Sequence, residues 1–388
     1  MTNLTETAVF SLGVFLSNSH KNVLKRKAVN HKRYGFLALL AEEAAKAGDT
    51  LFFFCPEDVR KKENLITEGL YYDLKTGDWL TAEFPVPAVI YERIYLKTDE
   101  VEQIRRYFRK KQVKSINSQI SFDKCDTHRK LSRCKSAAGY LPPAIDVNNF
   151  NDVRRFLLRY NTVYLKKGMS SLGKGVLKVA RVSPNRYEYS HFRSRLRTRA
   201  VADIEKLRTP IHNFFKNNKY IAQKGIDLLT LDESSIDFRA EVQRSGPDIT
   251  IPAVSARVGI KRSPITVHSV AMPAEEFFRT ELDYSEEQIQ EKMKEIHVFL
   301  HTIYMALEKS YGALGEIGID FGIDRDGELW FIEANSKSAK VSLEKSYGIA
   351  GLRKNAENIL SYARYLTGIQ KKDADLPPSD AEQQAPPL

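Results

Sequence analysis

The residues most suited to chemistry lie in a late segment, GIDFGIDRDGELWFIEAN. Its Asp326-Gly327 pair is typical of a two-residue turn between antiparallel strands, because both positions tolerate a positive φ. With such a turn, Asp320 lies directly opposite Glu333 in the neighbouring strand. Asn335 follows Glu333 by two residues and therefore lies on the same face. The pattern predicts two carboxylates and an amide within a few ångströms of one another.

Two carboxylates that face each other repel unless a cation lies between them. Hard oxygen ligands of this kind suit Mg²⁺ that is held jointly with substrate phosphates. The alternative is a surface hairpin whose polar side chains are simply hydrated. We favour the metal site because the hairpin has a strongly apolar context. The other face is expected to carry Ile319, Phe321, Trp330 and Ile332, and the acidic face to carry Leu329 and Phe331 as well.

A second candidate is the segment VYLKKGMSSLGKGV, in which a strand ends at Lys166 and a glycine-bearing loop follows. Glycines let backbone N–H groups approach phosphate oxygens, and a lysine on the adjoining strand supplies a fixed positive charge. The spacing is not that of a P-loop, because Val176 stands where Ser or Thr is needed. By itself the segment is equally consistent with an ordinary hairpin loop. The loop residues concerned are Gly168, Ser170, Ser171, Gly173 and Gly175.

A third candidate is NKYIAQKGIDLL, where a strand ends in Gln223-Lys224-Gly225-Ile226 and could present backbone groups to a purine edge. Read alone, it is a strand end and no more. His128 follows Lys124 in the first turns of a helix. We expect it to be solvated, with contact to a nucleotide as the alternative.

The elements that must position these residues begin with an α/β pattern. The chain of 388 residues predicts two or three domains. Strands at 8–17, 50–55 and 88–95 with a helix at 34–47 predict an open α/β domain. No glycine-rich fingerprint follows the first strand, which argues against a dinucleotide site.

The second region opens at about residue 116 and has alternating strands and helices up to 367. A tail from 371 to 388 is rich in Pro, Asp and Gln, and we expect it to be disordered. Helices are predicted at 124–138, 285–311 and 355–367, and strands at 162–166, 175–181, 220–223, 238–243, 251–258, 318–323 and 328–335.

Composition limits the functional classes. Hydrophobic residues make up 42% of the chain, enough for a sizeable core, and no apolar run approaches the length that spans a bilayer. We therefore expect no membrane partner. Three cysteines, Cys55, Cys125 and Cys134, form neither a disulfide framework nor a paired metal motif, and we expect Cys125 and Cys134 to be buried. A reducing, cytoplasmic location is expected.

The net charge of +11 raises the question of nucleic acid. Its basic runs lie at 105–114 and 193–199, and neither is interleaved with stacking aromatic residues. We therefore expect no nucleic-acid partner. The alternating Arg193, Arg195, Arg197 and Arg199 could line one face of a strand and meet an anion or an acidic substrate.

Together these residues resemble the ATP-grasp enzymes. Asp123-Lys124, Lys166, IAQKGI and the acidic hairpin follow in the order of that superfamily. The hairpin is similar to that of the D-alanine–D-alanine ligase branch. From about residue 8 to 367 the chain resembles the spore-coat-associated, YheC/YheD-type ATP-grasp proteins of bacilli. The stretches concerned are AVIYERIY, INSQISFDKCDTHRKL, VYLKKGMSSLGKGV, DFRAEVQRSG and SARVGIKRSPIT.

The resemblance implies an α/β (α+β) chain in which a pre-ATP-grasp domain precedes a two-lobed ATP-grasp fold. The domain ranges would be 1–115 and 116–370, with a nucleotide-lid lobe at about 145–222, a catalytic lobe at about 223–370 and the tail at 371–388.

It also implies a role for each candidate residue. Lys124 and Lys166 would hold the ATP phosphates, and the loop with Gly168, Ser170, Ser171 and Gly173 would close over them. The adenine would be flanked by Gln223, Lys224 and Ile226. Mg²⁺, with Mn²⁺ as an alternative ion, would be bound by Asp320, Glu333 and Asn335. Arg239 and Arg257 would stabilise charge on the transferring phosphoryl group.

The implied activity is ATP-dependent activation of a carboxylate as an acylphosphate, followed by attack of an amine or thiol. ATP, a carboxylate and an amine would be the substrates, and spore coat proteins the partners. The alternative is an ATP-binding structural component of the coat with weak or no turnover. Its motivation is the run 266–271, which lacks the amide and paired glycines of many relatives, together with the proline-bearing tail.

Overall fold

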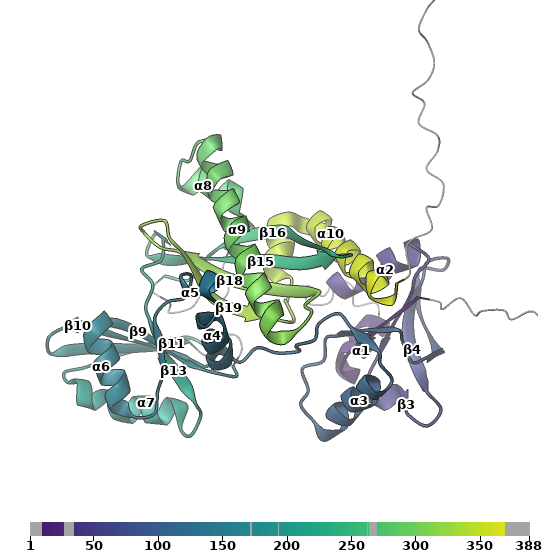
Figure 1. Ribbon diagram of the computed structural model, residues 1–388, viewed down its shortest axis with the longest axis horizontal. Helices are drawn as coiled ribbons and strands as arrows, with labels where there is room; N and C mark the ends of the chain where they lie inside the picture. The colour runs from purple at the N-terminus through teal and green to yellow at the C-terminus, as the bar shows by residue number, and fades with distance from the viewer. Residues whose placement is uncertain are drawn as a thin grey trace, which may run out of the picture.

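The computed structural model describes residues 10–26, 35–170, 173–192, 194–261, 263 and 270–368. It has a mixed α/β architecture built on three sheets. In Figure 1 the N-terminal sheet lies at the right, the second sheet at the lower left and the third between them. No described helix is long and apolar enough to cross a membrane. Ser171, Arg193, residues 266–269 and the tail from 371 lie outside the described residues.

The N-terminal sheet has the strand order β3-β4-β2-β1-β6-β7, with β5 paired to β4. Its centre is parallel, as the βαβ pattern predicts, but an antiparallel β4–β5 hairpin is added at one side. The sequence analysis missed that hairpin, because a bulge between Ile66 and Gly69 interrupts the alternation. The elements are β1 (Ser11–Phe15), α1 (Asn18–Lys25), α2 (Gly35–Lys46), β2 (Thr50–Phe54), η1 (Pro56–Asp58), β3 (Val59–Arg60), β4 (Leu65–Asp73), β5 (Asp78–Pro85), β6 (Val89–Glu92), α3 (Asp99–Lys110) and β7 (Lys114–Ser115).

Two short helices lead to the second sheet. The sequence pattern predicted one helix over 124–138, but the chain leaves the helix at Cys134, whose φ and ψ are extended. The result is α4 (Lys124–Ser132) and α5 (Lys135–Ala138). Cys125 and Cys134 are half-buried rather than buried, and only Cys55 is fully enclosed. α4 packs against both the second sheet and α9 (Glu286–Tyr311) of the third layer, so its first residue can reach the space between them.

The second sheet is antiparallel, with the order β12-β11-β10-β9-β13-β8. The helices α6 and α7 cover one face, where Leu157, Ile211 and Phe215 pack against Leu165 and Val179. The opposite face carries Lys166, because neighbouring residues of a strand point to opposite sides. The elements are β8 (Ala144–Asp146), α6 (Phe150–Tyr160), β9 (Thr162–Lys167), β10 (Val176–Ser183), β11 (Arg186–Phe192), β12 (Leu196–Val201), η2 (Ile204–Leu207), α7 (Arg208–Phe215) and β13 (Tyr220–Lys224).

The third sheet has the order β17-β16-β15-β18-β19, with β14 paired to β15. Helix α9 covers one face through a large apolar core, and α10 packs between the sheet and α2 of the N-terminal domain. The predicted helix 355–367 is only the end of α10, which begins at Val341 and is kinked at Gly348, where φ is 59°. The elements are β14 (Thr230–Leu231), β15 (Ser234–Ser245), β16 (Asp248–Val258), β17 (Val270–Pro273), α8 (Ala274–Glu281), α9, β18 (Glu316–Ile323), β19 (Leu329–Asn335) and α10 (Val341–Thr367).

The β18–β19 hairpin confirms one prediction and corrects two. Asp320 does pair with Glu333, but Ile323 pairs with Leu329, so the predicted two-residue turn is wrong. The longer loop shifts the register by one residue, and a bulge at Ile332 shifts it back. The bulge also moves Phe331 and Leu329 to the face of Phe321, in the apolar core, and not to the acidic face as the sequence predicted.

Candidate active site

Three charged residues lie in one line across the third sheet. Arg239 of β15 pairs with Asp320 of β18, which in turn pairs with Glu333 of β19. We call Arg239, Asp320 and Glu333 the site row. Cross-strand partners share a face, so their side chains project to the same side. Arg239 binds Asp320 through two parallel contacts, of which Nη2 to Oδ2 measures 2.9 Å.

A second arginine strengthens this arrangement. Arg257 donates two hydrogen bonds to Asp237, at 2.6 and 2.7 Å, and its Nη2 lies 3.4 Å from Oδ1 of Asp320. Burial alone would raise the pKa of Asp320, but the charges and hydrogen bonds of Arg239 and Arg257 lower it to about 2. Asp320 is therefore a permanent anion, held between two permanent cations.

Glu333 at the end of the site row meets a cation from a distant part of the chain. The Nζ atom of Lys124, the first residue of α4, lies 2.7 Å from Oε2 of Glu333. The backbone N–H of Lys124 donates to the carbonyl of Gly168, at 3.0 Å, and ties α4 to the end of β9. Asp123 caps α4 so closely to Gly168 that a side chain at 168 would collide with its carboxylate. The glycine thus permits the contact that brings Lys124 to Glu333.

Lys166 projects into the same space from β9. In the described part of the chain it has no carboxylate within ion-pair distance. Burial lowers the pKa of Lys166 to about 8, with Glu333 opposing and Lys124 adding to the effect. The loop after β9 turns back through Gly173, whose φ of 67° suits glycine, and returns at Val176 opposite Lys166. The carbonyl of Ser170 in this loop accepts from Lys124 Nζ at 3.3 Å.

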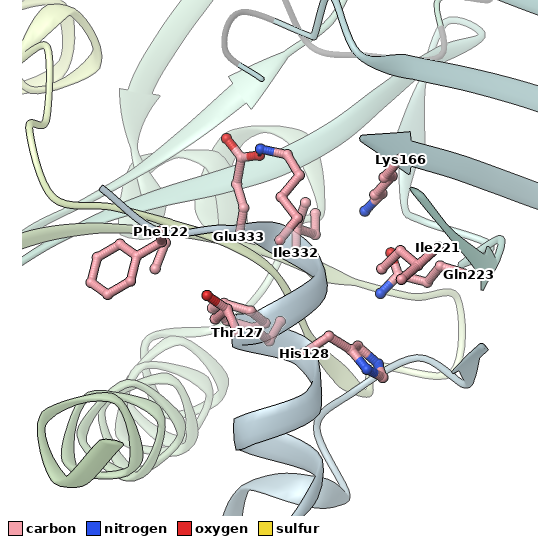
Figure 2. A pocket seen from close by; sticks show the side chains of 11 residues that line it. Phe122, Thr127, His128, Lys166, Ile221, Gln223, Ile332 and Glu333 are labelled. Carbon is pink, nitrogen blue, oxygen red and sulfur yellow. The ribbon is translucent and has the colours of Figure 1, made fainter. Parts of the chain in front are cut away.

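Lys124, Lys166 and Glu333 border a cleft between α4, the second sheet and the third sheet. Figure 2 shows Lys166 and Glu333 on its upper side and His128 on its lower side. The cleft is lined by Phe122, Lys124, Thr127, His128, Lys166, Ile221, Gln223, Phe331, Ile332, Glu333 and Ala334. Positive charge together with apolar walls is suited to a ligand with a flat ring and an anionic chain.

Several lining residues were missed by the sequence analysis. Phe122, Thr127, Ile221 and Ile332 are apolar or small and have no chemical motif that could have identified them. His128 was expected to be solvated, and that was wrong: it lines the cleft, with Nε2 3.0 Å from the carbonyl oxygen of Pro142. Burial lowers its pKa, so the imidazole is predominantly neutral at pH 7.

Other predicted residues lie outside this cleft. The Lys224 side chain is exposed and lies near the ring of Tyr160, and Ile226 is half-buried beyond the lining residues. The backbone N–H of Lys224 is already paired with Pro143, at 2.8 Å. Of the strand-end group, Gln223 alone is among the lining residues.

The predicted arginine stripe is also away from the cleft. Arg195 lies in a bend before β12, whereas Arg197 and Arg199 are exposed on that edge strand. Arg199 pairs with Tyr189, Tyr189 with Val179 and Val179 with Val163. These cross-strand partners share a face, and Val163 lies on the face that the helices cover. Lys166 lies on the opposite face, so Arg199 does not face the cleft.

The carboxylate and amide oxygens at the site row are the types of ligand that a hard divalent cation prefers. Glu333 and Asp320 contribute carboxylates, and the Asn335 amide lies beside Glu333, with Nδ2 3.4 Å from Oε1. In the described ranges, no group of three or more His, Cys, Asp or Glu side chains could hold a metal ion. A cation at the site row would therefore need further oxygen ligands, such as the Asn335 amide and phosphate oxygens.

Comparisons with known proteins identify the family and the fold. Residues 112–366 match the family described as YheC/D like ATP-grasp. The endospore coat-associated protein YheD of Bacillus subtilis (strain 168) is 23% identical over 340 residues, which cover 86% of this chain and 74% of that protein. Among solved structures, D-cycloserine synthetase DcsG has a TM-score of 0.54 at 13% identity, covering 92% of this chain and 99% of that one.

A further structure, the VanG D-Ala:D-Ser ligase of Enterococcus faecalis, has a TM-score of 0.53 at 12% identity and covers 92% of this chain and 99% of that one. At such low identity these two structures establish the fold only. The fold is that of the ATP-grasp ligases, as the resemblance implied. Because the family match extends over most of the sequence, the chain belongs to the YheC/D-like ATP-grasp family.

Proposed function

We propose that this protein is an ATP- and Mg²⁺-dependent ligase that activates a carboxylate as an acylphosphate for attack by an amine or thiol. The observation that carries the proposal is that Glu333, at the end of the site row, lines one cleft together with Lys124 and Lys166. Phosphoryl transfer depends mainly on positioning and on neutralisation of charge, and this arrangement supplies cations and metal-type ligands together.

The nucleotide would lie along the cleft. Its phosphates would contact Lys124, Lys166 and the loop of Gly168, Ser170, Ser171 and Gly173, and its adenine would lie near Gln223. Ile221 and Ile332 offer apolar surfaces to the ring. Lys224 and Ile226 would reach the adenine only through their backbone groups, since neither side chain lines the cleft.

Asp320, Glu333 and Asn335 would hold Mg²⁺, or Mn²⁺ in its place. When bound, the metal neutralises phosphate charge and keeps the transferring group in position. Arg239 and Arg257 lie beside Asp320 and would stabilise charge on the transferring group. The pKa values of both arginines are raised, so they stay charged at every physiological pH.

The transfer would proceed in two steps. A carboxylate oxygen of the substrate attacks the γ-phosphorus, the bond to the bridging oxygen breaks, and ADP leaves. An amine or thiol then attacks the acyl carbon, inorganic phosphate leaves, and the nucleophile loses its proton. The names of the synthetase and the ligase that share the fold support this reaction class. The name of the YheD relative supports a role in spore coat assembly, with coat proteins as partners. The cytoplasmic location stays a prediction from the sequence.

The test is to trap the acylphosphate. The protein is incubated with ATP, MgCl₂, hydroxylamine and a panel of small carboxylic acids and acidic peptides, and hydroxamate and ADP are measured together. We expect equal amounts of both with at least one acid. Glu333→Gln should lower the rate by at least about 100-fold. The exposed Glu328 of the same hairpin provides the control, and Glu328→Gln should retain full activity.

A second candidate is an ATP-binding component of the coat without turnover. The observation in its favour is that both oxygens of Asp320 are already occupied by Arg239. Tight ATP binding without hydroxamate or ADP from any acid of the panel would support this function over the ligase.

A further inference from the structure

Two ion pairs in the site join residues with opposite expected roles. Lys124, expected to bind phosphate, is paired with Glu333, expected to bind metal. Arg239, expected to face the transferring phosphoryl group, is paired with Asp320, the other expected metal ligand. Each carboxylate therefore has a cation of this chain in the position that a metal ion would compete for.

The two pairs differ in how easily they can open. The Glu333 side chain is 28% exposed and Lys124 is 15% exposed, and Lys124 carries its charge on a flexible four-carbon stem. Asp320 is 7% exposed and has Arg257 as a further partner. Opening the Lys124–Glu333 pair costs little, because solvent and phosphate can replace the lost contacts. Opening the Arg239–Asp320 pair requires a change among buried charges.

We propose that Lys124 shields Glu333 from free divalent cations and releases it only when nucleotide phosphates bind Lys124. This exchange of partners rests on the proposed function, and it adds an order in which the metal and the nucleotide bind. The metal enters with the nucleotide, and the protein alone binds it weakly. Lys166 does not take part in the exchange, since it lines the cleft without a carboxylate partner at ion-pair distance among the described residues.

The exchange predicts that removal of Lys124 changes ATP affinity and metal affinity in opposite directions. Removal of Lys124 takes away a phosphate ligand, which weakens ATP binding. The same change frees Glu333, which strengthens the binding of metal alone. A residue that merely bound phosphate, or merely supported the fold, would not strengthen metal binding. Lys166 is the matched comparison, because it should affect ATP binding alone.

The experiment measures Mn²⁺ binding to the full chain without nucleotide, by the electron paramagnetic resonance signal of free Mn²⁺, and ATP binding by calorimetry. For Lys124→Met we expect Mn²⁺ to bind about tenfold more tightly than to the wild type, because an adjacent opposite charge has gone. ATP should bind at least about tenfold more weakly. For Lys166→Met we expect weaker ATP binding and an Mn²⁺ affinity within about twofold of the wild type.

Two further variants secure the interpretation. Lys124→Gln keeps a polar side chain and should show the same opposite signs if Lys124→Met fails to fold. In the double variant Lys124→Met/Glu333→Gln, the gain in Mn²⁺ affinity should disappear. Unchanged or weaker Mn²⁺ binding to folded Lys124→Met protein overturns the exchange, even where ATP binding is lost as expected. Failure of the proposed ligase function would appear elsewhere, as ATP binding without hydroxamate or ADP, and would leave the Mn²⁺ measurements unchanged.

Discussion

The molecule contains two charged clusters that differ in what surrounds them. The site row borders a cleft through Glu333, which is its most exposed member and pairs with Lys124. The other, which we call the interdomain cluster, comprises Arg93, Glu241, Glu316 and Lys340. Lys340 contacts Glu241 at 2.6 Å and Glu316 at 2.7 Å, and Arg93 of the N-terminal domain lies 3.3 Å from Glu316. The side chains of Lys340 and both glutamates are at most 3% exposed.

The difference in exposure separates a cluster that holds the fold together from one whose charges can change partners. In the interdomain cluster every charge has a partner within the chain, and its lysine and glutamates are almost fully enclosed. Arg93 also donates to the carbonyl of Ser338 at 2.7 Å, which ties the N-terminal domain to the segment after β19. In the site row, the partners are the groups that nucleotide and metal would replace. The interdomain cluster should therefore control stability, and the site row should control binding.

The largest expected effect is at Lys340. Lys340→Met leaves Glu241 and Glu316 without their shared cation in a buried place, which should destabilise the fold by about 3–5 kcal/mol. The measurement is the free energy of unfolding in urea. The control is Lys354→Met, at an exposed lysine of the helix that Lys340 precedes as N-cap, and it should cost less than about 0.5 kcal/mol. Equal losses in the two variants would remove the distinction between the clusters.

At Glu333 the expected effect is on binding. Glu333→Gln should weaken binding of ATP with Mg²⁺ by about 10- to 100-fold, since one carboxylate ligand is lost. The free energy of unfolding should change by less than about 1 kcal/mol, because the pair with Lys124 is partly exposed. Calorimetry and urea unfolding measure the two quantities. A loss of stability as large as that of Lys340→Met would contradict the comparison.

Lys166 gives ATP binding at the cleft a pH dependence. Its pKa of about 8 means that Lys166 is mostly charged below pH 8 and mostly neutral above it. Phosphate favours the charged form, so ATP binding takes up a proton near pH 8. Between about pH 7.5 and 9, ATP affinity should fall by about tenfold, measured at constant salt and Mg²⁺. In Lys166→Arg the side chain stays charged over this range, so the fall in ATP affinity with pH should become much smaller. An equally steep fall in that variant would show that another group causes the pH dependence.

The smallest expected effect is at Gly168. In Gly168→Ala the new methyl group meets the Asp123 carboxylate, so the cap of α4 must shift. We expect a loss of about 1 kcal/mol in stability, the usual value of a helix cap, and a several-fold loss in ATP affinity as Lys124 moves. Gly139→Ala is a matched control, because no described atom lies within 4 Å of the position of its added methyl group. Unchanged ATP affinity in Gly168→Ala would show that the position of Lys124 does not depend on the contact between α4 and the end of β9.

The predicted hairpin shows how far sequence reasoning reached. Alternation within strands placed Asp320 and Glu333 opposite each other, and the pairing confirms it. The reasoning assumed a two-residue turn and no bulge, and both assumptions were wrong. Their effects on register cancel, because the bulge at Ile332 inserts one residue and the longer loop shifts the pairing by one. Phe331 was therefore assigned to the wrong face although the acidic pair was right.

The β4–β5 hairpin escaped prediction for a local reason. A bulge interrupts the alternation of β4, and β5 lies at the sheet edge, where one side is exposed and the apolar pattern is weak. The walls of the cleft were missed for another reason. Phe122, Ile221 and Ile332 are ordinary apolar residues, and only the approach of three separate elements makes them a surface.

By itself, the sequence determined the α/β class and the chemical types of the candidate site residues, because these follow from local order, spacing and strand alternation. The superfamily came from the resemblance of its motifs to those of the ATP-grasp enzymes. Tertiary structure decided which charges meet. Lys124 and Glu333 come from distant parts of the chain and are joined only because Gly168 lets α4 approach β9. No local period encodes such a contact, since it depends on how separate sheets and helices pack around a shared core.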